Sequence, residues 1–466
     1  MKLGQIIKNS GAVIIKGTPD TEITSIASDS RKVVPGALFI AVKGCGSDGH
    51  DYIGSALENG AVAVVDADRK ALALCADAFY SHPSGRLQLV GITGTNGKTT
   101  TVTLLYRLFR SLGYECGLLS TIANYVGTRR SETLNTTADP ITINSLMAEM
   151  VDAGCQYCFM EVSSIGIEQE RVAGLEFKAG IFSNLTHDHL DYHGTFAEYL
   201  RCKKLFFDNL PKEAVAITNI DDRNGLVMMQ NTAAKVITYS CQSPADHNCR
   251  IMEESFEGML LRIDGTEAWT RLVGRHNAYN ILAIFSTAVA LGVDKDEALL
   301  AISKLESAPG RLETLRGPRG LAVVIDYAHT PDALENVLCT LRDIAPGREL
   351  ICLFGCGGDR DRSKRPEMAA IAEKLADRIF VTSDNCRTEN PDAIIAEIKT
   401  GFSRSGMAKV ISISDRREAI RAAILTAPEN ATILVAGKGH EDYQIIGTVK
   451  HHFNEREIVN ETFKQI

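Results

Sequence analysis

Residues 91–101 read GITGTNGKTTT, and this stretch determines how the rest of the chain is interpreted. The apolar run LQLV (87–90) before it is short enough for a buried strand. After it, Val102, Leu105, Leu108 and Phe109 fall on one face of a helix. A glycine-rich loop between a strand and a helix directs backbone N–H groups at an anion, which the helix dipole also attracts. The stretch therefore predicts a nucleoside triphosphate site.

Two side chains of this loop carry specific chemistry. Lys98 is placed to reach the terminal phosphates, and the hydroxyl of Thr99 is placed to ligate a magnesium ion. The common phosphate-loop pattern has a glycine where this chain has Ile92, and the glycines here stand at 91 and 94 instead. The alternative is a glycine turn with a chance GKT, which the flanking strand and helix disfavour.

The composition is that of a globular protein, with 45% apolar and 23% charged residues in 466. This length exceeds one hydrophobic core, so roughly three domains are expected. The net charge of −8 disfavours nucleic-acid binding, and no apolar run approaches the roughly 18 residues that span a bilayer. The N-terminal residues lack the apolar core of a signal peptide, and the twelve scattered cysteines indicate reduced thiols. We therefore expect a cytoplasmic protein that binds neither nucleic acid nor a membrane.

The order of strand and helix patterns divides the chain after residues 86 and 309. Residues 1–86 hold the apolar strands ALFIAV and AVAVV around a glycine-rich loop, which predicts a small α/β domain. Residues 87–309 alternate strands and helices, as in a parallel sheet covered on both faces, with an antiparallel insertion at 231–273. Residues 310–466 predict a Rossmann-like domain with five buried parallel strands. The expected fold class is α/β with three domains, the central one a phosphate-loop ATPase-like domain.

Polar residues follow the predicted central strands, where ligands bind in parallel sheets. Glu161 and His189 end two such strands and are candidate magnesium ligands, although either could be an ordinary solvated residue. Helical periodicity at 196–207, taken alone, indicates that one or both of Lys203 and Lys204 are solvated. Asn277 lies at the start of a later helix and could either cap it or contact an adenine or ribose.

Charged residues of both signs follow the strands of the third domain. The segments are 326–331, 355–362, 384–387 and 437–442. Arginine clamps a carboxylate bidentately, and Glu441 would accept from an ammonium group, so the pattern suits an amino-acid ligand. A surface network of ion pairs is the alternative.

Together these stretches resemble the Mur ligases, ATP-dependent amide ligases of peptidoglycan precursor synthesis. The resemblance covers essentially the whole chain. It rests on nine segments in family order: DSR…PGALFIAVKG…DGH, TGTNGKTTT, LNTTADP, EVSSIGIEQERV, SNLTHDHLDYHGT, DYAHTPDAL, FGCGGDRDRSKRPEM, SDNCRTENP and AGKGHEDYQ. It implies a monomer that uses ATP and Mg²⁺ to join meso-diaminopimelate to the D-Glu side chain of UDP-MurNAc-L-Ala-D-Glu through an acyl phosphate.

The resemblance also implies roles for individual residues. Lys98, Glu161, His189 and Lys203 would be catalytic, and Lys203 would be carbamylated and bind Mg²⁺ with Thr99, Glu161 and His189. ATP would contact Gly94, Thr95, Asn96, Gly97, Lys98, Thr99, Thr100, Asn277, Arg311 and Asp326. The UDP-MurNAc dipeptide would contact Ser28, Ser30, Cys45, Gly46, Ser47, Asn135, Thr136, Thr137, Ser163, Gln169 and Arg171. Diaminopimelate would contact Arg360, Asp384, Asn385, Cys386, Arg387, Gly437 and Glu441.

Two positions depart from the family pattern. Cys386 stands where relatives commonly have proline in DNPR, and Ile165 stands where they commonly have histidine. Arg387 is retained, which favours diaminopimelate over lysine because the distal carboxylate needs a cationic partner. A lysine-adding relative, a folylpolyglutamate synthetase-like ligase and a nucleotide-gated scaffold with a decayed site are the alternatives.

Overall fold

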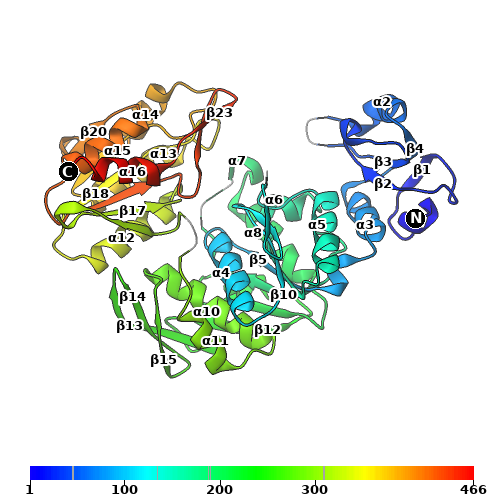
Figure 1. The fold of residues 1–466 in the computed structure, drawn as a ribbon, viewed down its shortest axis with the longest axis horizontal. Coiled ribbons are helices and arrows are strands. Elements are labelled where there is room, and N and C mark those ends of the chain that lie inside the picture. The colour runs from blue at the N-terminus through cyan, green and yellow to red at the C-terminus, as the bar shows by residue number, and fades with distance from the viewer. Residues whose placement is uncertain (45–46, 134, 187, 189, 308–309) are drawn as a thin grey trace.

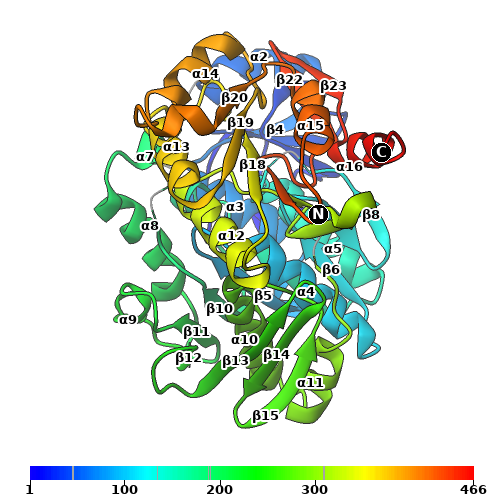
Figure 2. The same cartoon turned by 90° about the vertical axis from the view of Figure 1, so that its left-hand side faces the viewer.

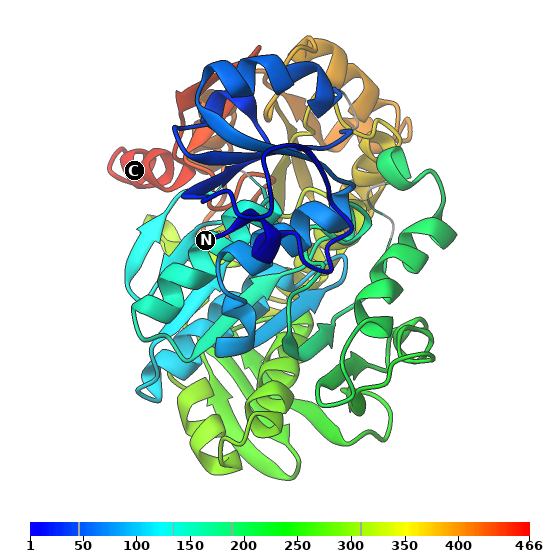
Figure 3. The same cartoon turned by 90° about the vertical axis from the view of Figure 1, so that its right-hand side faces the viewer.

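The computed structural model describes residues 1–44, 47–133, 135–186, 188, 190–307 and 310–466. Within these residues the strands form three large sheets and one small hairpin. The chain begins at one end of the long axis of the molecule and finishes at the other, with the largest sheet between them (Figure 1). Figure 3 looks along this axis with the N-terminal end toward the viewer. No helix of the described residues is long and apolar enough to cross a membrane.

The N-terminal sheet has the strand order β1-β4-β3-β2, parallel except for β1. The apolar runs ALFIAV and AVAVV form its central strands, β3 and β4, as predicted. The elements are α1 (Leu3–Ile6), β1 (Val13–Lys16), β2 (Ser25–Ala27), η1 (Ser30–Lys32), β3 (Ala37–Ala41), η2 (Gly49–Tyr52), α2 (Ile53–Glu58), β4 (Ala61–Asp66), α3 (Arg69–Phe79) and η3 (Pro83–Arg86).

The central sheet has the order β15-β14-β13-β12-β11-β10-β5-β9-β6-β7-β8. Its strands are β5 (Gln88–Thr93), β6 (Cys116–Leu119), β7 (Asn124–Val126), β8 (Arg129–Ser131), β9 (Tyr157–Glu161), β10 (Phe177–Phe182), β11 (Val215–Asn219), β12 (Lys235–Ser240), β13 (His247–Ser255), β14 (Gly258–Ile263) and β15 (Thr266–Thr270). Its helices are α4 (Lys98–Ser111), α5 (Pro140–Asp152), α6 (Ser164–Glu168), α7 (Leu190–His193), α8 (Phe196–Asp208), α9 (Gly225–Met228), α10 (Arg275–Ala290) and α11 (Lys295–Ile302).

The prediction of an antiparallel insertion at 231–273 is wrong in two respects. The strand β12 pairs in parallel with both β11 and β13, so it belongs to the main sheet. Only β13, β14 and β15 pair antiparallel, and they extend the same sheet at one edge. The antiparallel strands β7 and β8 at the other edge were not predicted, because three-residue strands leave almost no pattern in the sequence.

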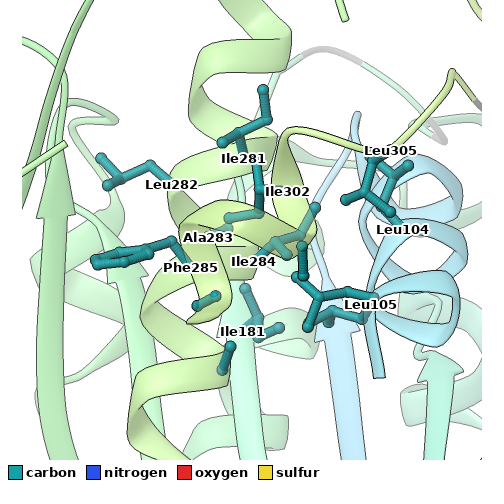
Figure 4. Packing of buried hydrophobic residues seen from close by; sticks show 14 of the residues in the cluster. Leu104, Leu105, Ile181, Ile281, Leu282, Ala283, Ile284, Phe285, Ile302 and Leu305 are labelled. Atoms are coloured by element: carbon teal, nitrogen blue, oxygen red, sulfur yellow. The ribbon is translucent and has the colours of Figure 1, made fainter. Parts of the chain in front are cut away.

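Both faces of the central sheet are covered, as the apolar strand pattern predicts. On one face, α4, α10 and α11 pack over the sheet, with Leu105 and Phe285 in contact with the same core as Ile181 of β10 (Figure 4). On the other face, α5 and α8 bury Met147, Phe206 and their neighbours. Figure 1 shows α4 and α5 on opposite sides of β5.

The third sheet has the order β16-β17-β21-β18-β19-β20 (Figure 2). Its elements are β16 (Glu313–Arg316), η4 (Pro318–Gly320), β17 (Ala322–Asp326), α12 (Pro331–Ile344), β18 (Leu350–Phe354), α13 (Lys364–Leu375), β19 (Arg378–Val381), α14 (Pro391–Lys399), η5 (Gly406–Lys409), β20 (Val410–Ser412), α15 (Arg416–Leu425), β21 (Thr432–Ala436) and α16 (Glu455–Phe463), with a hairpin of β22 (Tyr443–Ile446) and β23 (Val449–His452) beside it.

The five predicted strands of this domain are all present and parallel. Only four are buried, because β20 lies at the sheet edge and is largely exposed. The antiparallel edge strand β16 was not predicted. Three α/β units in sequence confirm the predicted fold class.

Candidate active site

The phosphate loop joins β5 to α4, as predicted, and two of its glycines allow close packing. Gly94 has φ +153°, and a Cβ there would lie 1.9 Å from the Ser183 hydroxyl oxygen. Gly97 has φ +90°, and a Cβ there would lie 2.6 Å from Oδ1 of Asn280. Neither space nor backbone conformation admits a side chain. The two glycines therefore let the loop pack closely against Ser183 and Asn280 at the start of α4.

Gly91 has a different role. A Cβ at this position would lie 2.6 Å from the ring of Phe177 and 2.7 Å from that of Phe206 in α8. The missing side chain lets α8 approach β5 closely. This approach brings Lys203 of α8 to the phosphate loop.

Two ammonium groups converge on one backbone carbonyl of the loop. Nζ of Lys98 lies 2.9 Å from the Gly94 oxygen, and Nζ of Lys203 lies 2.7 Å from the same atom. The prediction from helical periodicity that Lys203 is solvated is wrong. Lys203 is only 1% exposed, and its ammonium group also lies over the Tyr199 ring. Lys204 is partly buried too and pairs with Asp208. Burial, with Lys98 adding to it, holds the pKa of Lys203 well below its ordinary value.

Glu161 ends β9 beside β5 and is fully buried. Its carboxylate accepts hydrogen bonds from the backbone N–H of Thr121 at 2.8 Å and from the Thr121 hydroxyl at 3.1 Å. Burial lowers the pKa of Lys98, and the charge of Glu161 opposes this shift. His189 lies outside the described residues.

These residues fit a magnesium ion by the chemistry of their donor atoms. Glu161 and Thr99 offer carboxylate and hydroxyl oxygens, which Mg²⁺ prefers. The hydroxyl of Thr93, on the strand next to Glu161, is buried with no hydrogen-bond partner among the described residues. No group of three or more His, Cys, Asp or Glu in the described part of the chain could hold a metal.

A cavity of about 340 Å³ opens beside the phosphate loop. Six residues predicted for ATP line it: Asn96, Gly97, Thr100, Asn277, Arg311 and Asp326. Asn277 does not cap α10, because Gly274 is the N-cap and the Asn277 amide donates to the Val273 carbonyl. Arg311 lies over the ring of Tyr327. Burial raises the pKa of Asp326, and the charge of Arg311 opposes that shift.

Three acidic residues that line this cavity, Asp221, Asp222 and Asp332, were missed by sequence reasoning. Asp221 accepts hydrogen bonds from Tyr279, Ser240 and backbone N–H groups. Asp332, in the first turn of α12, accepts from the side-chain amide of Asn96 at 2.7 Å. The third domain thus contacts the phosphate loop directly. Asp332 lies within the segment DYAHTPDAL, whereas Asp221 lies in none of the nine segments.

A second cavity, of about 420 Å³, lies between the N-terminal sheet and α5. Ser28 lines it, together with Asp29, Lys32, Tyr80 and Asp139. Ser30 is buried in η1 and is not among the lining residues. Ser47 is exposed, and Cys45 and Gly46 lie outside the described residues.

The residues predicted for the dipeptide gather near Glu161 instead. The hydroxyl of Thr137 donates to the Glu161 carbonyl and accepts from the Ser163 N–H. Arg171 donates to Gln169 and to the Thr137 carbonyl. Thr136 accepts from the Thr121 hydroxyl, whereas Asn135 is exposed.

The acidic residues predicted for the amino acid form one buried cluster in the third domain. Asp384 and Asn385 follow β19, and Glu441 follows β21. The Glu441 carboxylate accepts from the Asn385 amide at 2.9 Å. It also pairs at 2.9 Å with Lys438, which the sequence analysis did not single out. The ammonium group that pairs with Glu441 in this structure is therefore that of Lys438.

The remaining predicted residues surround this cluster. Gly437 has φ +121°, and a Cβ there would lie 2.9 Å from Oδ2 of Asp384. Arg387 donates to the Gly358 and Asn385 carbonyls. The thiol of Cys386 is buried, while Arg360 is exposed with its guanidinium near the Asp359 carbonyl.

Buried Arg416 connects the two loops of the cluster. It donates to the carbonyls of Ser383 and Ala436, which precede Asp384 and Gly437, and pairs with buried Glu455. Helical periodicity alone could not distinguish it from a solvated arginine.

Three protein-family models match the chain in order. They are "Mur ligase family, catalytic domain" at residues 22–90, "Mur ligase middle domain" at 92–288 and "Mur ligase, glutamate ligase domain" at 310–439. The chain is 49% identical to the UDP-N-acetylmuramoyl-L-alanyl-D-glutamate–2,6-diaminopimelate ligase of Parabacteroides distasonis, over 99% of both chains. The chain belongs to the Mur ligase family.

More distant Mur ligases agree with this assignment. The diaminopimelate ligase of Bacillus cereus is 40% identical over 96% of this chain and 95% of its own. A solved structure of a diaminopimelate ligase superposes with a TM-score of 0.70 at 31% identity, covering 100% of this chain and 99% of its own. The MurF ligase of Thermotoga maritima, solved with ADP, shares the fold at 19% identity, with a TM-score of 0.66 over 96% of this chain and 98% of its own.

Proposed function

We propose that this Mur ligase adds meso-diaminopimelate to the D-Glu side-chain carboxylate of UDP-MurNAc-L-Ala-D-Glu, with ATP converted to ADP and phosphate. The observation that carries the proposal is the identity of 49% over 99% of the chain with a ligase named for this reaction. The phosphate loop and the charged cluster of the third domain supply the two kinds of site that the reaction needs.

The first step is phosphoryl transfer at the phosphate loop. ATP binds in the cavity of about 340 Å³, with its phosphates at residues 94–100 and its nucleoside toward Asn277, Arg311 and Asp326. A carboxylate oxygen of D-Glu attacks the γ-phosphorus, and ADP leaves. Lys98 and Lys203 now donate to the Gly94 carbonyl, and the ammonium of Lys98 turns toward the phosphates to offset their charge.

Thr99, Glu161, His189 and a carbamylated Lys203 would hold Mg²⁺, which would neutralise the phosphate charge during transfer. Carbamylation requires a neutral amine, because the nitrogen lone pair adds to the carbon of CO₂ and a proton is then lost. Burial favours that neutral form, because it lowers the pKa of Lys203 well below its ordinary value. The modification would convert a buried cation into an anionic ligand.

The second step is amide formation. The diaminopimelate amine, held by the third domain, attacks the acyl carbon, and phosphate leaves with the electrons of the C–O bond. Asp384, Asn385 and Glu441 bind the ammonium and polar groups of the amino acid, while Arg360 and Arg387 pair with its carboxylates. Closure of the third domain about Arg311 excludes water from the acyl phosphate.

The N-terminal domain and the segments near Glu161 are proposed to bind the nucleotide substrate. The uridine nucleotide binds at Ser28, Ser30 and residues 45–47. The muramoyl dipeptide reaches residues 135–137, Ser163, Gln169 and Arg171, next to Glu161. We place the reaction in the cytoplasm and the protein in a monomeric state, with residues 1–86, 87–309 and 310–466 as its domains.

The test is phosphate release from ATP and UDP-MurNAc-L-Ala-D-Glu with a panel of amino acids. We expect release with meso-diaminopimelate and at least tenfold less with lysine. A preference for lysine would assign the chain to the lysine-adding relatives. No release with any amino acid would contradict a ligase activity of this kind.

A further inference from the structure

Lys438 is an ammonium group buried inside the charged cluster of the third domain, with no exposed surface. It follows β21 directly, between Gly437 and Gly439. Its Nζ lies 2.9 Å from Oε2 of Glu441 and 3.1 Å from Oδ1 of Asn385. A third oxygen, Oδ1 of Asp384, lies at 3.5 Å. One side chain from the β21 loop therefore binds the β19 loop at two residues.

The charges around Lys438 do not balance. Asp384 and Glu441 carry two negative charges, and Lys438 supplies one positive charge. The other buried cation nearby, Arg416, pairs with Glu455 and donates its remaining N–H groups to carbonyls. Asp384, Glu441 and Lys438 taken together thus keep one net negative charge at the place where the amino acid is proposed to bind.

The Lys438 ammonium also keeps the two acids together. Burial raises the free energy of a carboxylate, and two neighbouring carboxylates repel each other. Despite burial, Lys438 and Arg416 hold the pKa of Asp384 below its ordinary value. Without Lys438, Glu441 and Asp384 would separate or one of them would take up a proton.

We propose that Lys438 is a positioning residue of the amino-acid site. It fixes Glu441 against Asp384 and Asn385, and it leaves a single net negative charge for the ammonium group of the incoming amino acid. This inference rests on the proposed function, because it assumes that the cluster binds the amino-acid substrate. It assigns to Lys438 no contact with the reacting atoms.

The test compares Lys438→Met with Lys450→Met by phosphate release, varying each of the three substrates in turn. Both ammonium groups lie over the Tyr443 ring, that of Lys438 at 5.6 Å from its centroid and that of Lys450 at 4.1 Å. Lys450 belongs to the exposed strand β23, so it is a matched control. For Lys438→Met we expect the KM of the amino acid to rise at least 30-fold. The KM of ATP, the KM of the UDP-dipeptide and kcat should stay within about threefold. Lys450→Met should change none of them by more than about twofold.

An unchanged KM for the amino acid, or an equal rise in all three KM values, would overturn the proposal. If Lys438→Met does not fold, the double variant Lys438→Met/Glu441→Gln removes one charge of each sign and restores the net charge of the cluster. It should fold and show a higher KM for the amino acid than Glu441→Gln alone, because Asp384 and Asn385 have also lost their contact with Lys438. A KM equal to that of Glu441→Gln alone would count against Lys438.

The assay uses whichever amino acid of the panel the wild-type enzyme accepts best. Its outcome is therefore separate from that of the proposed function. Wild-type activity with lysine in place of diaminopimelate would change the named substrate and leave the Lys438 comparison interpretable. No wild-type activity at all would refute the proposed function and with it the role of Lys438.

Discussion

At the phosphate loop, the ammonium groups of Lys98 and Lys203 both donate to the Gly94 carbonyl, whereas in the third domain Lys438 lies between Asp384 and Glu441. Within the described part of the chain, neither loop lysine forms an ion pair with a carboxylate. Burying a cation without a counter-ion is unfavourable. The phosphate loop thus carries two amines that pair with no carboxylate of the described residues, whereas Lys438 in the third-domain cluster is paired with two.

This difference in charge pairing between the two sites indicates what each site contributes to the proposed reaction. The loop concentrates positive charge where ATP brings negative charge, and burial holds the pKa of Lys203 there well below its ordinary value. The third-domain cluster arranges charges of both signs before any ligand arrives, as recognition of a zwitterionic amino acid requires. Replacing a loop lysine should therefore affect chemistry more than stability. Replacing a cluster cation should affect stability or amino-acid binding.

The largest expected effect follows from replacing Lys203. We expect Lys203→Met to lower the rate of phosphate release by about 10³-fold, the size of effect seen when one stabilising group is removed from an active site. Its melting temperature should stay equal or rise, because a buried amine that forms no ion pair with a described carboxylate is lost. Lys204→Met, one residue along α8 and paired with Asp208, is the matched control and should remain within about threefold of wild type.

A third variant tests the state of Lys203 itself. If the working group is a carbamate, Lys203→Glu should retain more activity than Lys203→Met, since glutamate places a carboxylate near the same position. Equal inactivity of the two variants, together with loss of ATP binding in both, would instead indicate that Lys203 acts as a cation.

The second largest effect concerns the charged cluster of the third domain. Arg416→Met removes the partner of buried Glu455 and should lower the free energy of unfolding of the third domain by about 3 kcal/mol. Arg416→Met/Glu455→Leu should recover part of this loss, because no buried charge is left unpaired. Arg417→Met, whose partner Glu461 is exposed, should change it by no more than about 0.5 kcal/mol. Urea denaturation followed by circular dichroism measures the free energy of unfolding of all three variants. Equal decreases for Arg416→Met and Arg417→Met would contradict a special stabilising role of the buried Arg416–Glu455 pair.

The sequence predicted this molecule best where local pattern and spatial position coincide. The strand–loop–helix at residues 87–111 and the parallel strands of the third domain follow from apolar runs and glycine spacing. The burial of Lys203 could not be predicted in this way, because it depends on Gly91, which lies more than a hundred residues earlier and admits α8. Lys438 and Arg416 were missed for the same reason, since their partners come from other strands. The β7–β8 hairpin and the edge strands are too short to carry a periodic signal.

The third effect tests the contact between the phosphate loop and the third domain. Burial raises the pKa of Asp332 above its ordinary value of 3.8, although Asn96 donates to its carboxylate. The ionised form is thus disfavoured in the folded chain. Its contribution to stability falls as the pH rises from the unfolded pKa through the folded pKa.

Asp332→Asn removes this penalty and keeps an acceptor for Asn96. We expect its melting temperature to exceed that of wild type by about 2 °C at pH 7 and by less at pH 4, as measured by calorimetry. The same gain at both pH values would mean that the charge of Asp332 is not responsible. Glu335→Gln, one turn further along α12 and more exposed, is the control and should show no such pH dependence.

The smallest effect concerns Cys386. The loop that contains it is held by its neighbours, because the Arg387 N–H donates to the Ile445 carbonyl and the Gly358 N–H donates to the Asn385 carbonyl. Among the described backbone hydrogen bonds between loops, none uses the N–H of Cys386, so a proline there would break no such bond. Cys386→Pro should therefore raise the free energy of unfolding by about 0.5 kcal/mol through the unfolded chain, with the KM of the amino acid unchanged within twofold. A decrease of more than 1 kcal/mol in the free energy of unfolding, or a higher KM, would contradict this prediction. It would show that residue 386 has a backbone conformation that proline cannot adopt, and that the hydrogen bonds to β22 alone do not hold the loop.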